Sequence, residues 1–109
     1  IDLENMKTTN LRVIAAVAHG SVPGAESSML KIRGTEIRQE ILSLIRRAMG
    51  PYALPFIEAA QYEGYADAPV GPKEAATAAA SYFNYRKLSI FGGSNEIQKN
   101  IISKMILGL

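Results

Sequence analysis

The chain contains no cysteine, no tryptophan, a single histidine and no long apolar run. Without cysteine it has no disulfide, no thiolate metal site and no cysteine nucleophile, and with only His19 as an imidazole we expect no metal site. No apolar segment approaches the roughly 20 residues that cross a bilayer, so we expect no membrane span. Twelve basic and ten acidic residues are interspersed, with a net charge of +2. Nucleic-acid binding needs a denser basic face, so we expect no nucleic-acid partner.

What the sequence does contain is a helical pattern over the length of one domain, 109 residues. Residues 2–19 and 25–49 carry apolar residues at helical spacing. Residues 73–89 predict a buried, alanine-rich helix that Gly92-Gly93 ends, and the last helix spans about 94–106. With no strand pattern, we predict an all-α fold, an up-down helical bundle of three long helices and one shorter one.

Two apolar stripes are expected to face the core of this bundle. Gly50-Pro51 should end the helix that carries the first stripe, because glycine tolerates a left-handed cap and proline does not continue the helix. The first stripe, on 25–49, comprises Met29, Ile32, Ile37, Ile41, Leu44, Ile45 and Ala48. The second, on the last helix, comprises Ile97, Ile101, Ile102, Met105 and Ile106.

The N-terminus suggests that the sequence is part of a larger protein. Residues 1 and 2 already look helical with no cap before them, and the chain lacks an initiator methionine. The N-terminus is not a signal peptide, so we expect a protein that is not secreted. We expect it in the cytoplasm of a bacterium or in the mitochondrial matrix of a eukaryote. Residues 51–72 hold four of the five prolines, and we interpret this irregular stretch as functional or mobile.

The stretch from Phe91 to Gln98, FGGSNEIQ, offers the best candidate site. Gly92 and Gly93 allow positive φ and close approach of a ligand to the backbone. The helix that follows presents unpaired N–H groups and a positive dipole end, which favour phosphate. Ser94 should cap this helix, and Glu96 complements its dipole. The alternative interpretation is a plain turn between two helices.

Other polar residues suggest little chemistry. His19 lies before Gly20 and is expected to interact with a helix C-terminus. Arg47 either stabilises a helix C-terminus or reaches a phosphate. Glu36 and its acidic neighbours on the same helix are interpreted as a solvated face. One histidine outside any motif does not indicate a catalytic triad.

Three stretches together resemble the C-terminal helical domain of acyl-CoA dehydrogenases. They are TNLRVIAAV, ESSMLKIRGTEIRQEI and YFNYRKLSIFGGSNEIQKNIISKMILGL. The last is the most specific, because the family ends in an aromatic-x-Gly-[Thr/Ser]-x-x-Ile-Gln-[Arg/Lys] run that often closes in Leu-Gly-Leu. Here that run is Phe91 to Lys99, and the chain closes at Leu107-Gly108-Leu109. The resemblance covers essentially the whole chain.

The resemblance implies a flavoprotein built from an N-terminal helical domain, a middle β domain and this C-terminal bundle, 1–109. Such enzymes remove two hydrogens from an acyl-CoA thioester: a glutamate takes the α-proton and the flavin of FAD takes the β-hydride. FAD lies at a subunit interface, which implies a homo-oligomer, dimer or tetramer, or a hetero-oligomer with a paralogue. The fragment alone is expected to be inactive, because the base and the β domain are absent from it.

One family contact is only partly retained in the loop after the long helix. The resemblance aligns a Gln-x-x-Gly-Gly-x-Gly pyrophosphate and adenosine contact with residues 47–53. Only Gly50 keeps its glycine, while Arg47 replaces the glutamine and Pro51 and Ala53 replace glycines. Arg47 and Gly50 are the cofactor-binding candidates here.

The terminal motif supplies the remaining candidates. The resemblance places the Ser94 hydroxyl on the flavin diphosphate, Glu96 near the adenine, Phe91 beside flavin and substrate, and Gly93 near the substrate. Gly92 occupies the position of the catalytic glutamate of many relatives, and glycine has neither acid nor base. No catalytic residue is therefore assigned in this chain.

Three interpretations remain open. The base comes from an earlier helix of the same domain, or the protein is a paralogue that lost its base and works beside an active subunit. The third is a helical assembly module with no cofactor role.

Overall fold

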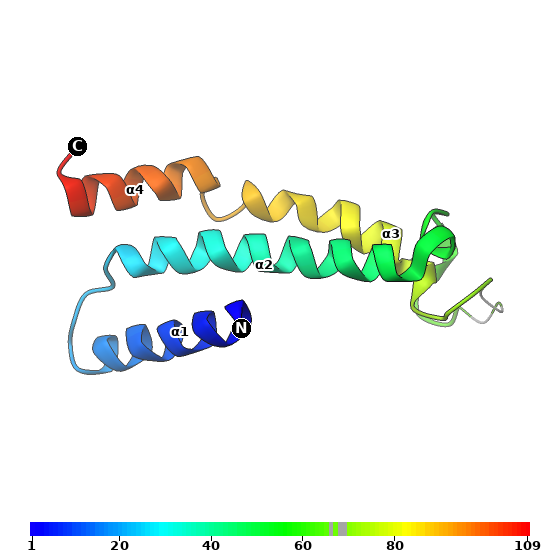
Figure 1. Cartoon of the computed structure of the whole chain (residues 1–109), viewed down its shortest axis with the longest axis horizontal. Helices are drawn as coiled ribbons and strands as arrows, with labels where there is room; N and C mark the ends of the chain where they lie inside the picture. The colour runs from blue at the N-terminus through cyan, green and yellow to red at the C-terminus, as the bar shows by residue number, and fades with distance from the viewer. Residues whose placement is uncertain (66, 68–69) are drawn as a thin grey trace. The chain divides into compact units, whose positions relative to one another are not determined.

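The structure is a computed structural model that describes residues 1–65, 67 and 70–109. Helices and turns make up this part of the chain, and it contains no strand (Figure 1). The elements are α1 (Asp2–Ala18), α2 (Ala25–Met49), the 3-10 helices η1 (Gly50–Ala53) and η2 (Glu58–Gln61), α3 (Ala75–Asn84), the 3-10 helix η3 (Tyr85–Ser89), and α4 (Asn95–Leu107). The predicted all-α class is confirmed.

The chain divides into two compact units. The first joins Ile1–Ile37 to Lys87–Leu109, and the second is Arg38–Arg86. In the first unit, α1 and α4 lie beside the first part of α2 and both run antiparallel to it (Figure 1). Gly34 of α2 faces Met6 of α1, and a Cβ there would lie 3.5 Å from the Met6 sulfur, an ordinary van der Waals distance. This alternation is the up-down arrangement that the sequence predicts.

The second unit is built around the alanine-rich helix α3, which contacts η1 and η2. The buried face of α3 is made entirely of alanine, and Ala53 of η1 is buried as well. Small side chains allow the backbones of α3 and η1 to approach closely, so the predicted burial is confirmed for the alanines, whereas Phe83 of the same helix is exposed. The alanines of the buried face are Ala75, Ala76, Ala78 and Ala79.

Two arginines of α2 and one of η3 lie over the rings of the tyrosines that follow this alanine face. The Arg46 guanidinium lies 4.7 Å from the centre of the Tyr82 ring, and Arg86 lies at the same distance from that ring. Arg38 lies 4.6 Å from the Tyr85 ring. Such cation–π contacts contribute about 0.5–1 kcal/mol each at exposed positions, and they align α3 with the second part of α2.

The predicted helix 73–89 is wrong as a single α-helix over its last five residues. The α-helix ends at Asn84 and continues as the 3-10 helix η3. The Gln39 side-chain amide donates to the carbonyls of Tyr85 and Arg86, at 3.3 and 3.2 Å. These bonds from α2 satisfy carbonyls in the first turn of η3, directly after α3, and so stabilise the tighter turn there.

The predicted apolar stripes are also largely wrong as core. On α2 only Ile32 of that set is buried, while Met29, Ile41, Leu44 and Ile45 are exposed. The last helix, predicted to point its apolar residues inward, has no buried residue. Figure 1 shows the reason, since α4 has α2 on one side and no further helix of its own unit on the other. Within the described residues, no helix is both long and apolar enough to cross a membrane.

Candidate functional site

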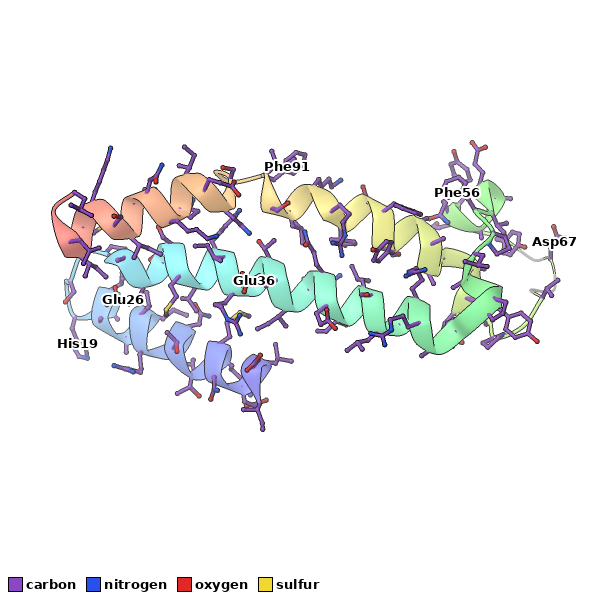
Figure 2. All side chains as sticks on the ribbon, turned by 45° about the horizontal axis from the view of Figure 1, so that its top comes forward. His19, Glu26, Glu36, Phe56, Asp67 and Phe91 are labelled. Atoms are coloured by element: carbon purple, nitrogen blue, oxygen red, sulfur yellow. The ribbon has the colours of Figure 1, made fainter. Side chains whose placement is uncertain are left out.

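The candidate site is the turn between η3 and α4. Gly92 and Gly93 both have positive φ, +68° and +82°, which a residue with a Cβ adopts only with strain. Ser94 then caps α4, because its Oγ accepts from the Ile97 N–H at 3.4 Å. Phe91 precedes the glycines and is exposed on this turn (Figure 2). The predicted cap and the predicted need for glycine are both confirmed.

The two glycines differ in their surroundings. A Cβ at Gly92 would meet no atom within 4 Å, whereas one at Gly93 would lie 2.7 Å from the Gln98 Nε2. That nitrogen donates to the Gly92 carbonyl at 3.0 Å. The side chain of Gln98 therefore closes the turn onto the first turn of α4 and leaves the backbone at Gly92 open.

Glu96 already uses the positive end of α4. Its pKa is lowered, first by a hydrogen bond from its own backbone N–H, then by the Ser94 hydroxyl, and then by the charges of Lys99 and Lys31. Its carboxylate is thus stabilised as an anion at a helix N-terminus. The same donors would serve a phosphate, so a bound phosphate and the Glu96 carboxylate would compete for them.

Two residues of α2 hold the connection between η3 and α4. The Lys31 ammonium donates to the Asn95 side-chain oxygen at 2.8 Å. Thr35, which is buried, has its hydroxyl oxygen 2.9 Å from the Lys31 carbonyl and 3.4 Å from the Leu88 carbonyl. Sequence analysis did not identify either residue, because a bond between positions 31 and 95 leaves no local pattern.

The hydrogen bond of the Gln98 side chain could have been predicted from the sequence. It forms part of the FGGSNEIQ stretch, and it lies six residues after the glycine whose carbonyl it caps. A side-chain amide in the first turn of a helix is well placed to reach back to the preceding turn, much as in a capping box. The sequence analysis considered only the backbone of the two glycines and did not predict this side-chain bond.

The other predicted cofactor residues lie in the second unit and are described separately from the turn. Arg47 is exposed in the last turn of α2, where a positive charge suits the helix C-terminus. Gly50 follows with a φ of +57°, and a Cβ there would meet no atom within 4 Å. Gly50 thus ends α2 as predicted.

The remaining titratable residues act locally. His19 is the C-cap residue of α1, and its backbone N–H donates to the Ala15 and Ala16 carbonyls. Glu26 and Glu36 are exposed, and Glu36 accepts from Arg33 at 2.6 Å (Figure 2). Among the described residues, no group of three or more acidic or histidine side chains is placed to hold a metal ion.

The chain is thus a small all-helical domain with a glycine turn before its last helix. The family model of the acyl-CoA dehydrogenase C-terminal domain matches residues 1–107. Because the match covers nearly the whole chain, the chain belongs to this family. No curated protein and no solved structure gives a significant match.

The Ser94 hydroxyl supports both the cap and the charge of Glu96, so Ser94→Ala should change two measurable quantities. Loss of an N-cap lowers the free energy of unfolding by about 1 kcal/mol. The pKa of Glu96 should rise toward its ordinary value, because one of the bonds that lower it is lost. Carboxyl NMR titration and thermal unfolding measure these two effects.

The sign of the pH dependence follows from the lowered pKa. The carboxylate of Glu96 stabilises the fold above the pKa it has in the unfolded chain, and this stabilisation is lost as the pH falls through its lower folded pKa. In Ser94→Ala the folded pKa lies closer to the unfolded one, so the loss of stability should be smaller and should be complete at a higher pH. Ser103→Ala, on the same helix but away from the turn, is the control; an equal effect there would contradict the assignment.

Proposed function

We propose that this chain is the C-terminal domain of an FAD-dependent acyl-CoA dehydrogenase. In the intact protein it would contribute to FAD binding, to the acyl-CoA pocket and to the oligomer interface. The N-terminal helical and middle β domains would belong to a longer chain. The observation that carries this proposal is the family match over residues 1–107, together with the glycine turn that retains the family's terminal motif.

The residues of the turn have the donors that a diphosphate needs. The Ser94 hydroxyl lies at the N-terminus of α4, next to the unpaired backbone N–H groups of the first turn. The open backbone at Gly92 leaves space for a ligand. Glu96 opposes an anion at this position, so we propose that its carboxylate turns toward the adenosine part when FAD binds. Bound flavin would supply the hydride acceptor.

Phe91 and Gly93 are proposed to line the pocket on the substrate side of the same turn. Phe91 is exposed in this chain, and the Lys87 ammonium lies 5.5 Å from its ring centre. An exposed aromatic ring beside a bare backbone segment is suited to contact a flat, apolar ligand surface. Arg47 and Gly50 remain proposed contacts to the pyrophosphate and adenosine.

Gly92 supplies no proton acceptor, so we propose that the 109-residue chain alone has no dehydrogenase activity. In the intact protein the base would come from an earlier helix of this domain. A base-less paralogue that assembles with an active subunit is the alternative. A dye-reduction assay with an acyl-CoA and added FAD tests the first point; measurable turnover by the isolated chain would refute it.

The exposed apolar face of α4 supports the proposed role in oligomer assembly. Ile97, Met105 and Leu107 are more than half exposed on this helix, and apolar surface left open in this way commonly marks a contact with another protein surface. A homo-oligomer, or a hetero-oligomer with a paralogue, would cover it.

Flavin retention by the intact protein tests the cofactor role directly. We expect Ser94→Ala to lower the flavin-to-protein ratio after dialysis, because it removes a donor to the diphosphate; loss of one hydrogen bond to a charged group weakens binding by roughly tenfold or more. Ser103→Ala is the matched control on α4. If Ser94→Ala retained as much flavin as this control, the assembly module without a cofactor role would be the better interpretation.

A further inference from the structure

We infer that Lys31 is a positioning residue for the cofactor turn, acting through Asn95. The inference rests on the proposed function. Lys31 and Asn95 are 64 positions apart, and the bond between them, at 2.8 Å, ties α2 to the first residue of α4. It is a charge-assisted bond, and such bonds are shorter and stronger than neutral ones. The first residue of α4 directly follows Ser94, so its position sets where the capping hydroxyl lies.

The tether acts at one end of a short connection whose other end is also held from α2. Thr35 lies one helical turn after Lys31, and its buried hydroxyl reaches the Leu88 carbonyl of η3. Between these two points lie the glycines with positive φ, which have many alternative conformations available. Holding both ends from one rigid helix restricts the connection to the conformation that exposes the Gly92 backbone.

No carboxylate competes with Asn95 for the Lys31 ammonium in the part of the chain that the structure describes. Lys31 is half-buried, and none of the ion pairs formed among the described residues involves it. Its charge also lowers the pKa of Glu96, but Lys99 does so more strongly. Lys99 is exposed on α4, and none of the ion pairs in the described part of the chain involves it. The two lysines therefore separate a positional effect from a charge effect.

FAD titration of the intact protein, after removal of bound flavin, tests the inference. We expect Lys31→Met to weaken FAD binding by about tenfold, because the turn is no longer held in the binding conformation. Lys31→Arg retains the donor and should recover most of the affinity. Lys99→Met removes an exposed, screened charge and should change the Kd by less than about threefold.

A second pair of measurements separates the tether from folding and from charge. Asn95→Ala removes the acceptor while keeping the Lys31 charge, and it should weaken FAD binding as much as Lys31→Met does. The double variant should be no worse than either single variant if both act through one bond. The pKa of Glu96 should rise in Lys31→Met and in Lys99→Met alike, which reports that both charges were removed.

The outcomes that overturn the inference differ from those that overturn the proposed function. Equal weakening in Lys31→Met and Lys99→Met would show that charge alone matters. An unchanged Kd in Lys31→Met or Asn95→Ala, with wild-type binding intact, would reject the positioning role alone. A wild-type intact protein that takes up no FAD would reject the proposed function and this inference with it.

Discussion

Replacing Ala75 by leucine should destabilise the second unit by about 2 kcal/mol, because extra methylene groups in a filled core cost typically 1–3 kcal/mol. Ala75 is 1% exposed, and so is Ala53 of η1, which α3 contacts. The added side chain therefore has no open space to enter, and α3 would have to move away from η1. For a chain of this size the midpoint of thermal unfolding should fall by about 10 °C.

Thr77→Leu is the matched control for this prediction. Thr77 is exposed and lies two positions further along α3, so its substitution should change the free energy of unfolding by about 0.5 kcal/mol or less. Thermal unfolding followed by circular dichroism compares the two variants. Equal midpoints would show that the alanine face of α3 is not tightly packed.

The features predicted correctly from sequence are those that local rules determine. Ser94 caps α4 because a hydroxyl before a helix reaches an N–H three residues later. Gly50 ends α2 because glycine adopts positive φ without a Cβ clash. The alanine-rich helix is buried because small side chains permit close packing. Each of these depends on a few neighbouring residues, so the sequence alone was sufficient.

The errors come from residues that act over long separations. The change from α-helix to 3-10 helix after Asn84 depends on Gln39, which is 46 positions before the Tyr85 carbonyl it reaches. Lys31 and Asn95 are still further apart. Periodicity identifies which face of a helix is apolar, but whether that face is covered depends on the helices around it. This is why the stripes on α2 and α4 were recognised and their burial was not.

Gly93→Val should remove most of the flavin from the intact protein, which would be the largest effect of any single substitution in the turn. Gly93 has a φ of +82°, where a residue with a Cβ is disfavoured by roughly 1–2 kcal/mol, and a β-branched residue is worse. The new Cβ would also lie 2.7 Å from the Gln98 Nε2. Gln98 would have to move and give up its bond to the Gly92 carbonyl, at a further cost of about 1 kcal/mol.

The backbone strain at residue 93 and the loss of the Gln98 bond both destabilise the turn conformation that the proposed FAD site requires. If FAD binds only to that conformation, about 3 kcal/mol in total weakens its Kd by about 100-fold. Gly108→Val separates this effect from general backbone strain, because Gly108 has a φ of +71° at the C-cap of α4, and a Cβ there would meet no atom within 4 Å. Gly108→Val should lower the free energy of unfolding by a similar amount, because valine is also disfavoured at positive φ, and it should leave the Kd for FAD unchanged. Flavin fluorescence titration distinguishes the two, and equal affinity in both variants would mean that the glycine turn is only a connection between helices.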